Sequence, residues 1–463
     1  MSKGFKTQQA APGTMPAMNT TWNDLPGPPT PWWGLPKLAA MRRDYLGTIA
    51  AQQAYGDLPR LRILNERTVD VFDPELLREL MVDHADALIR WERGTEVFAD
   101  GLGQSVLVTE GTVWQRQRRM LMQAFTPKKV AGYAAVMLQA TDQGLADVQA
   151  GEVAMDALLS HLAMDVISRT LFGQPISGDT QAAAAASQVL SESALAEMFW
   201  PMTLPDWLPL PGKAAKRRAY RLISGLIRAR IADHTRATGS TNLLGMLRAV
   251  RDEATGQALS EQEVFDQCVL SFQAGHETTA TALCWWADLM ARHPEAQARA
   301  VGELDAVLAG QAPGVDAPQT LPYLSATLKE AMRLYPPAAA LLSRRLTRDI
   351  TLGGVRLPAR TMVRITPWVL HRDSRWWPEA TSFRPQRFLP DTPPPPRGAY
   401  LPFGVGPRVC LGQHFATLEM TLIAARLLQR FRLSPCNTEP PRPKLAVTLR
   451  PEGGVRLCLE ARP

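Results

Sequence analysis

The sequence predicts a mainly α protein with small β-sheets. Apolar residues recur at three- and four-residue spacing through most of the middle of the chain, as they do in amphipathic helices. Segments with strand character are few and short, and they turn at tight pairs of residues, so they predict hairpins rather than one large sheet. Apolar residues make up 46% of the chain and charged residues 21%, which is typical of a folded globular protein.

In chain order, the first regular element is a hairpin over residues 58–73. Helical periodicity then predicts helices over residues 114–150, 153–172, 182–198, 214–236, 261–291, 294–309 and 320–334. A second hairpin turns at Gly-Gly within residues 350–365, an amphipathic helix follows Gly412, and a third hairpin turns at Gly-Gly within residues 449–461. Proline-rich segments mark the loops between these elements.

No internal repeat and no linker-like segment divides the chain. We therefore expect residues 21–463 to form one domain that follows a flexible N-terminal tail of residues 1–20. No stretch has the roughly eighteen apolar residues of a membrane span, and the N-terminus lacks the apolar centre of a signal peptide. These features predict a cytoplasmic protein with no membrane anchor.

The charge and the cysteines exclude several other classes. The formal net charge is +7, but the basic residues are spread along the chain without a basic block, so nucleic-acid binding is not expected. A docking face for an acidic protein fits this charge better. The chain has five cysteines with no close pair, which predicts neither a CxxC metal clip nor a disulfide framework and favours a reducing compartment.

One cysteine lies in an unusual loop. Gly404, Gly406 and Gly412 flank Cys410, and glycine allows the main chain to approach a bound group closely. Cys410 also precedes the N-terminus of an amphipathic helix, where partial positive charge favours a thiolate, the form of cysteine that binds metals. A lone cysteine is by default an ordinary buried thiol, but these surroundings favour a metal ligand.

The loop resembles the haem-binding loop of the cytochrome P-450 superfamily. The residues that carry this resemblance are Phe403, Gly404, Gly406, Arg408, Cys410 and Gly412. The resemblance implies haem b, which is iron protoporphyrin IX, as the cofactor, with Cys410 as the axial thiolate ligand of the iron. It also implies a single mainly α domain, in which the haem lies between the central helix and the helix after Cys410.

The centre of the helix predicted over residues 261–291 departs from helix preference. Gly275 costs about 1 kcal/mol relative to alanine, and Glu277, Thr278 and Thr279 are modest or poor helix formers. Such a break alone indicates a close crossing between helices, with Glu277 in solvent. The segment also resembles the oxygen-activation motif of the same family. This implies that Thr278 contacts the bound dioxygen or an adjacent water, that Glu277 relays protons from solvent, and that the helix opens locally to make room.

Further arginines and a tryptophan are candidates for binding the haem propionates. Trp114 and Arg118 have the i, i+4 spacing of one helical face, which alone indicates a solvated basic face. In the family, residues at this spacing meet the propionates, because guanidinium geometry suits a carboxylate. Arg408 and Arg344 match the other propionate partners of the family, with Arg345 as the adjacent alternative to Arg344.

Glu330 and Arg333 lie one helical turn apart, and most such pairs are exposed and contribute roughly 0 to 1 kcal/mol. Here their neighbours are apolar. The resemblance implies a buried cluster of Glu330, Arg333 and Arg387, in which the charges must be paired.

The function implied by the resemblance is that of a monooxygenase. It inserts one oxygen atom of O2 into an apolar organic substrate, while two electrons from NAD(P)H convert the other to water. The implied electron donor is a separate ferredoxin or flavodoxin with its reductase, since the chain ends soon after the haem helix, and the protein is expected to be a monomer. Its expected docking residues are Arg116, Arg119, Lys128 and Lys129.

Two alternatives remain open at this point. An H2O2-dependent peroxygenase is expected to replace the acid–alcohol pair of Glu277 and Thr278, which is intact here. A non-catalytic haem-binding sensor or carrier does not need that pair. The expected substrate pocket draws on residues 91–109, 197–212 and 336–343 and on Ala274, which are mostly apolar or small.

Overall fold

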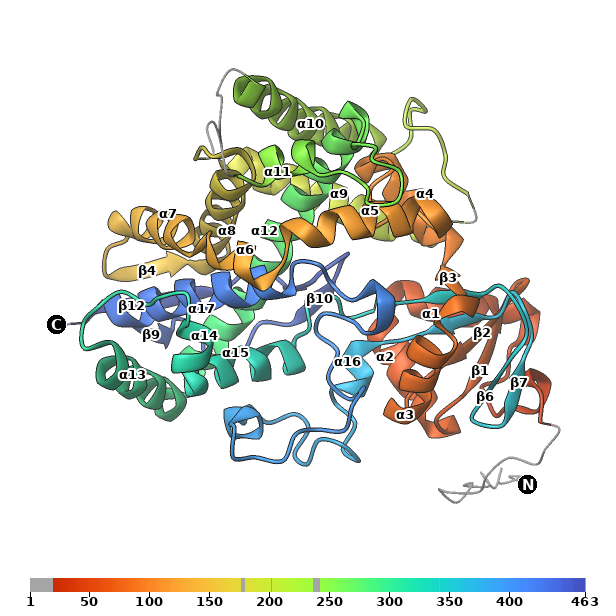
Figure 1. The fold of residues 1–463 in the computed structure, drawn as a ribbon. Helices are drawn as coiled ribbons and strands as arrows, with labels where there is room; N and C mark the ends of the chain where they lie inside the picture. Colours follow the sequence, from red (N-terminus) through yellow and green to blue (C-terminus); the bar gives the residue numbers. More distant parts are fainter. Residues whose placement is uncertain (1–19, 176–179, 201, 236–241, 341, 463) are drawn as a thin grey trace. The chain divides into compact units, whose positions relative to one another are not determined.

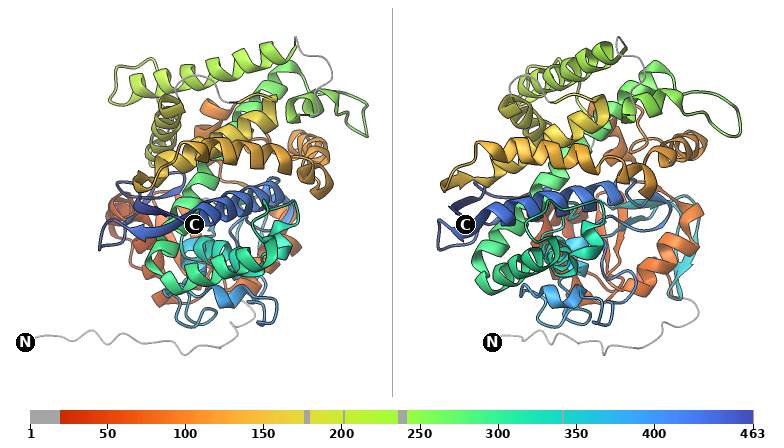
Figure 2. Two further views of the ribbon diagram at one scale, coloured as in Figure 1. Left: turned by 90° about the vertical axis from the view of Figure 1, so that its left-hand side faces the viewer. Right: turned by 60° about the vertical axis from the view of Figure 1, so that its left-hand side comes forward.

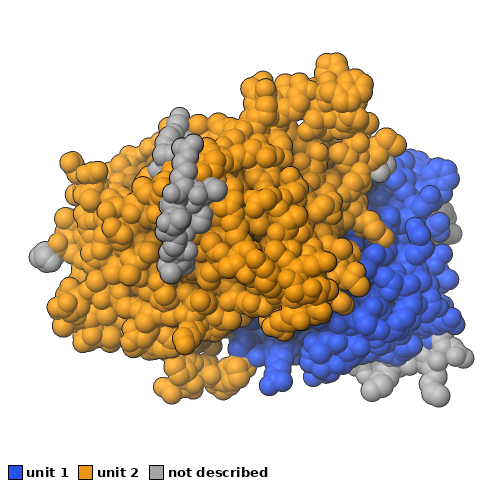
Figure 3. Space-filling model, turned by 45° about the horizontal axis from the view of Figure 1, so that its top comes forward, with its two compact units in different colours: residues 1–91, 340–378, 395–409 blue, residues 92–339, 379–394, 410–463 orange. Residues whose placement is uncertain are grey.

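The computed structural model describes residues 20–175, 180–200, 202–235, 242–340 and 342–462. Apart from Thr20, the predicted N-terminal tail therefore lies outside the described residues. The chain divides into two compact units, which Figure 3 shows in blue and orange. Unit 1 contains residues 1–91, 340–378 and 395–409, and unit 2 contains residues 92–339, 379–394 and 410–463. One domain over residues 21–463 stays a prediction.

The regular elements of unit 1 are short. They are α1 (Leu35–Arg43), α2 (Tyr45–Ala50), β1 (Arg60–Ile63), β2 (Glu66–Asp70), α3 (Pro74–Arg78), β3 (Leu88–Arg90), β5 (Arg344–Leu346), β6 (Ile350–Leu352), β7 (Val355–Leu357), β8 (Met362–Arg364) and α16 (Pro367–Leu370). Five strands form a sheet in the order β1-β2-β8-β5-β3, and β6 pairs with β7 (Figure 1). The β2–β8 pair is parallel and the others are antiparallel.

Unit 1 has an apolar core around this sheet. Val69, Val71, Val363 and Ile365, in and directly after β2 and β8, have no solvent-exposed surface. The sheet also positions the site residue Arg344, which lies in β5 opposite Val363 of β8.

Unit 2 contains the long helices. They are α4 (Glu92–Leu102), α5 (Gly111–Ala124), α6 (Pro127–Ala131), α7 (Ala134–Ala146), α8 (Met155–Phe172), α9 (Thr180–Met198), α10 (Lys213–Thr235), α11 (Leu243–Ala249), α12 (Glu261–Arg292), α13 (Pro294–Leu308), α14 (Ala317–Thr320), α15 (Pro322–Leu334) and α17 (Gln413–Arg430). Its strands are β4 (Gly151–Ala154), β9 (Phe431–Pro435), β10 (Pro443–Leu445), β11 (Leu449–Pro451) and β12 (Arg456–Ala461). They form a sheet in the order β4-β12-β9 and the pair β10-β11.

The helix α12 is the centre of unit 2. Its N-terminus is fixed by a capping box, in which Ser260 and Glu263 each accept a hydrogen bond from the other's backbone N–H. It packs against α8, α15 and α17, and it is buried almost throughout its second half. In Figure 2, α7 with α8, then α17, then α13 to α15 follow one another as layers of this unit. These contacts hold the middle of α12 in place.

The predicted fold class, mainly α with small β-sheets, is confirmed. The hairpins over residues 58–73 and within residues 350–365 are confirmed as β1–β2 and β6–β7, although Met362–Arg364 leaves the second hairpin to join the larger sheet as β8.

Two predictions of elements were wrong. The helix expected over residues 114–150 is three helices, because Pro127 cannot continue α5 and the Thr126 side chain instead caps α6. The hairpin expected within residues 449–461 does not form: β11 pairs with β10, while β12 pairs with β4 and β9. The helices α1 to α4 and α11 were not predicted from the sequence.

Candidate functional site

Cys410 lies directly before α17, as predicted, and its side chain is exposed. Desolvation by the neighbouring protein raises the pKa of the Cys410 thiol. A hydrogen bond from the Gly412 backbone and the positive charge of Arg118 oppose the rise in pKa. These two groups favour the thiolate, while desolvation of the sulfur disfavours it.

The glycines of the loop have a structural reason of their own. Gly404 and Gly406 have φ of 78° and 76°, a region that side chains disfavour. A side chain at Gly406 would also clash with the backbone carbonyl of Met81. By contrast, Gly412 has an ordinary φ of −84° and acts as the N-cap of α17. Two of the three glycines thus shape the loop itself.

The middle of α12 reaches solvent although the helix is otherwise buried there. Ala274 is exposed and Gly275, Glu277 and Thr278 are half-buried, while Phe272 and Thr279 are buried. The Thr278 hydroxyl donates to the Ala274 carbonyl at 2.7 Å, and α12 continues unbroken through this turn. The expected local opening of the helix is therefore not observed, and small side chains provide the access instead.

Glu277 has three partners in unit 2 that the sequence analysis did not identify. Its Oε1 lies 2.7 Å from a guanidinium nitrogen of Arg450 and accepts hydrogen bonds from Thr448 at 2.6 Å and Ser191 at 3.0 Å. Arg450 also donates to the Thr448 hydroxyl at 3.2 Å. Glu277 is thus held by α9 and by the segment around β11, rather than pointing freely into solvent.

Behind this turn, α17 contributes a buried carboxyl group. Glu419 accepts a hydrogen bond from the Thr279 hydroxyl at 3.2 Å, and its Oε1 has no hydrogen-bond partner among the described residues. Burial raises the pKa of Glu419 well above its usual value. Glu419 thus places a carboxyl group with a raised pKa beside the turn that carries Thr278.

Trp114 and Arg118 share one face of α5, as predicted. The Arg118 guanidinium carbon lies 5.9 Å from the centre of the Trp114 ring, within the range of a cation–π contact. Burial lowers the pKa of Arg118, and the opposite charge of a Cys410 thiolate raises it. The structure thus brings Trp114, Arg118 and Cys410 into one region of unit 2.

Arg344, Phe403 and Arg408 belong to unit 1. Arg344 is buried in β5, and Phe403 and Arg408 are half-buried in the loop before Cys410. The neighbouring Arg345 forms an ion pair with Glu66 at 2.6 Å and donates to the Arg360 carbonyl. Adjacent residues of a strand point to opposite faces of the sheet. Arg345 already pairs with Glu66, so Arg344, on the opposite face, is the better candidate for binding another anion.

The cluster of Glu330, Arg333 and Arg387 is present in unit 2. Glu330 and Arg333 have no exposed side-chain surface, and their closest charged atoms are 2.7 Å apart. Arg387 approaches Glu330 at 3.3 Å, and Arg333 also donates to the carbonyl of Ala380. Every one of these groups is paired, as a buried charge requires.

The four residues of the expected basic docking face differ in their surroundings. Arg116 is paired with Glu263 of α12, and Arg119 with Asp252 at 3.0 Å. Lys128 and Lys129 are exposed on α6. Two of the four candidates, Arg116 and Arg119, thus pair with carboxylates from other segments of the chain. The sequence of α5 alone could not predict these pairs.

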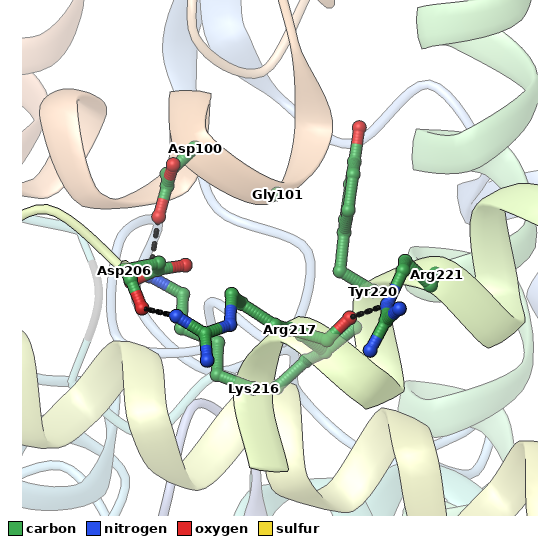
Figure 4. Close-up of a pocket in the computed structure, with 8 residues that line it drawn as sticks. Asp100, Gly101, Asp206, Lys216, Arg217, Tyr220 and Arg221 are labelled. Carbon is green, nitrogen blue, oxygen red and sulfur yellow. Dashed lines mark hydrogen bonds and ion pairs between the residues drawn. The ribbon is translucent and has the colours of Figure 1, made fainter. Parts of the chain in front are cut away.

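A pocket of 480 Å³ joins two of the stretches expected to line the substrate site (Figure 4). Its lining includes Asp100 of α4 and Asp206, together with Lys216 and Arg217 of α10. Lys216 is paired with Asp100, with Asp206 at 3.4 Å and with Glu197 at 3.0 Å. This pocket is charged, so it does not suit an apolar substrate.

The described residues contain neither a membrane-spanning helix nor a cluster of side chains that could hold a metal ion. No helix there has the length and apolar character to cross a membrane. No group of three or more His, Cys, Asp or Glu side chains in that part of the chain could hold a metal ion.

Comparisons with known proteins agree over nearly the whole chain. A family model described as cytochrome P-450 matches residues 26–459. The cyclooctatin synthase of Streptomyces melanosporofaciens is 34% identical over 427 residues, which cover 89% of this chain and 91% of that protein. The pentalenene oxygenase of Streptomyces avermitilis is 31% identical over 473 residues, 100% and 99% of the two chains. The cyclooctat-9-en-7-ol 5-monooxygenase of S. melanosporofaciens is 30% identical over 436 residues, 93% and 90%.

Proposed function

The chain belongs to the cytochrome P-450 family, and from that membership we propose that Cys410 is the axial ligand of a haem b iron. The protein is a haem-dependent monooxygenase that acts on an organic substrate. The observation that carries the proposed site is the exposed Cys410 thiol directly before α17, with the Gly412 N–H and the Arg118 charge beside it. These groups favour sulfur as an anion, which is the form that binds iron.

The surroundings of Cys410 fit this cofactor. Burial raises the thiol pKa, so a metal cation in contact with the sulfur would remove an unfavourable charge state. We assign the anionic propionates of the haem to Trp114, Arg118, Arg344 and Arg408, and the contact with its ring to Phe403. Arginine suits the propionates because its planar donors match a carboxylate.

When bound, haem activates O2 so that one oxygen atom enters a C–H or C=C bond and the other becomes water, with thiolate ligation favouring O–O cleavage. In our proposal, the Thr278 hydroxyl holds a proton at the exposed turn of α12. Its hydrogen bond to the Ala274 carbonyl fixes the orientation of that hydroxyl. The Glu277 carboxyl passes protons from the surface to this turn once it separates from Arg450 and Thr448.

The substrate we propose is a large apolar terpenoid. Two relatives are named for pentalenene and cyclooctat-9-en-7-ol, which are an alkene and an unsaturated alcohol. The small side chains Ala274 and Gly275 on the accessible turn of α12 suit a bulky apolar molecule. A charged substrate would need partners that this turn does not offer.

Members of the family receive electrons from redox partners. For this chain we propose a separate ferredoxin or flavodoxin with its reductase. Lys128 and Lys129 are exposed and provide positive charge for an acidic partner. We further propose a monomeric protein in the cytoplasm, since cysteines kept as thiols fit a reducing compartment.

The experiment compares Cys410→Ser and Thr278→Ala with the unmutated protein. The reduced, CO-bound unmutated protein should show the red-shifted Soret band of thiolate ligation, and Cys410→Ser should lose it. Thr278→Ala should retain that band and still consume NAD(P)H, while product falls and peroxide rises. Survival of the band in Cys410→Ser would overturn the ligand, and full coupling in Thr278→Ala would overturn the role of the threonine.

Turnover with H2O2, compared with turnover with O2 and reductant, distinguishes the two remaining alternatives. A monooxygenase should form product with O2 and reductant, whereas a peroxygenase would form it efficiently from H2O2 alone. Absence of turnover under both conditions, across a panel of terpenoids that shift the haem spectrum, would favour a sensor or carrier.

A further inference from the structure

Two cysteines that are distant in the sequence meet on the sheet β4-β12-β9. The sulfur atoms of Cys436 and Cys458 are 2.6 Å apart, although 22 positions separate the residues. Cys458 lies in β12 opposite Ser434 of β9, and Cys436 directly follows β9. Ser434 and Cys436 are two positions apart, so both cysteines point to the same face of the sheet.

This arrangement is close to that of a disulfide, in which the sulfur atoms are about 2.05 Å apart. The two strands already lie side by side, and the Cys436 N–H donates to the Arg456 carbonyl at 3.5 Å. A covalent bond therefore requires only a small shift of the side chains.

Access separates this pair from two of the other thiols, Cys268 and Cys284. Cys436 and Cys458 are half-buried, whereas Cys268 and Cys284 are buried. Burial and the adjacent Cys458 raise the pKa of Cys436 to about 11, so its thiolate fraction at neutral pH is small. Cys436 is therefore mainly a thiol at neutral pH, and the half-buried pair is reachable by a small oxidant.

The segment between the two cysteines carries the partners of Glu277. Residues 437–457 contain β10 and β11, with Thr448 and Arg450 bonded to the Glu277 carboxylate. The same segment is anchored by Lys444, which pairs with Glu192 of α9. A bond at the two ends of this segment would close it into a loop and reduce its freedom to move.

We propose that Cys436 and Cys458 are a reversible dithiol–disulfide switch, whose oxidation closes the loop 437–457 and holds Thr448 and Arg450 against Glu277. The effect on turnover rests on the proposed role of Glu277, because a proton relay requires its carboxylate to leave these partners. The formation of the disulfide does not depend on that role.

The oxidant is a low-molecular-weight disulfide such as oxidised glutathione. One cysteine thiolate attacks a glutathione sulfur, forms a mixed disulfide and releases the first glutathione thiolate. The second cysteine attacks the sulfur of the first, forms the Cys436–Cys458 bond and releases the second glutathione. Two protein thiols lose two electrons and two protons, and one glutathione disulfide becomes two glutathione thiols.

The first experiment treats the haem-loaded protein with oxidised glutathione and measures intact mass, alkylated thiols and linked peptides. We expect the mass to fall by about 2 Da, as two hydrogens leave, with a peptide linking Cys436 to Cys458 that dithiothreitol separates. Cys436→Ser and Cys458→Ser, the matched variants, should each keep glutathione on the remaining cysteine. A stable glutathione adduct on the unmutated protein, or free thiols after treatment, would overturn the proposal.

The second experiment measures hydrogen exchange and turnover of the same samples. Exchange of the amides of residues 444–450 should slow at least several-fold on oxidation, because loop opening becomes rarer. NAD(P)H oxidation should fall in parallel and recover with dithiothreitol, while Cys436→Ser should not respond to the oxidant. Unchanged exchange or unchanged turnover in the disulfide form would overturn the switch.

Glu277→Gln separates this proposal from the proposed function. Its disulfide should form normally, but its slow turnover should not change on oxidation. If Glu277→Gln turns over as fast as the reduced unmutated protein, the role of Glu277 fails, whereas the mass measurement still decides whether the disulfide forms.

Discussion

Replacing Glu330 with Gln should be among the most destabilising single changes in unit 2. The carboxylate accepts hydrogen bonds from two nitrogens of Arg333 at 2.7 and 2.8 Å, from the Arg384 backbone N–H at 2.9 Å and from Arg387 at 3.3 Å. Glu330→Gln keeps the shape of the side chain but removes its charge. A fully buried guanidinium then lacks its counter-ion.

The magnitude follows from the burial of both partners. Removing one partner of a buried ion pair costs about 3 to 5 kcal/mol, because the other charge stays desolvated. At about 1.4 kcal/mol per tenfold change, the unfolding constant should rise by roughly two to three and a half orders of magnitude. Solvent screening does not reduce this cost much, since neither Glu330 nor Arg333 is exposed.

The assay is urea unfolding of the haem-loaded protein, followed by far-UV circular dichroism and extrapolated linearly to water. Glu152→Gln is the matched control, because Glu152 forms an exposed pair with Arg456 and its loss should cost less than about 1 kcal/mol. A Glu330→Gln variant within 1 kcal/mol of the unmutated protein would refute the reasoning from burial.

Three further predictions address the carboxyl behind α12, the choice between neighbouring arginines and the docking face. Burial raises the pKa of Glu419 in the folded state, whereas in the unfolded chain this carboxyl group ionises above about pH 4.5. The free energy of unfolding therefore falls as the pH rises from about 4.5 toward the folded-state pKa. Glu419→Gln should therefore match the unmutated protein near pH 4 and exceed it at higher pH by about 1.4 kcal/mol per pH unit up to the folded pKa; a gap independent of pH in urea unfolding would contradict this. Arg344→Gln should speed haem loss to apomyoglobin more than Arg345→Gln, which should mainly lower the unfolding midpoint, and the reverse order would exchange their roles. Reversing Lys128 and Lys129 to Glu should slow reduction by an acidic ferredoxin severalfold at low salt but not at about 1 M salt, where the screening length is about 3 Å, and equal rates at low salt would exclude this face.

Local sequence patterns predicted the parts of the molecule that depend on neighbours in the chain. The helices α8, α12 and α17 follow from apolar periodicity, and Cys410 lies before α17 as its glycine-framed loop indicated. The i, i+3 spacing of Glu330 and Arg333 identified a pair that the structure shows to be buried.

Contacts between distant segments were beyond this reasoning. Thr448 and Glu277 are 171 positions apart, and nothing in either segment identifies the other as its partner. Cys436 and Cys458 looked unrelated because only the pairing of β9 with β12 brings them together. The third hairpin was predicted wrongly for the same reason: a Gly-Gly turn is a local signal, but β12 pairs with the distant strand β4 and with β9 rather than with β11.

The exposed turn of α12 makes the size of one side chain decisive. Ala274 presents a single methyl group where the helix reaches solvent, and its carbonyl holds the Thr278 hydroxyl. Added bulk at this position would stand between an approaching molecule and that hydroxyl, while the backbone hydrogen bond would remain. Residue 274 is therefore a natural place to change which molecules are accepted, and in what orientation, without altering the groups proposed to handle protons.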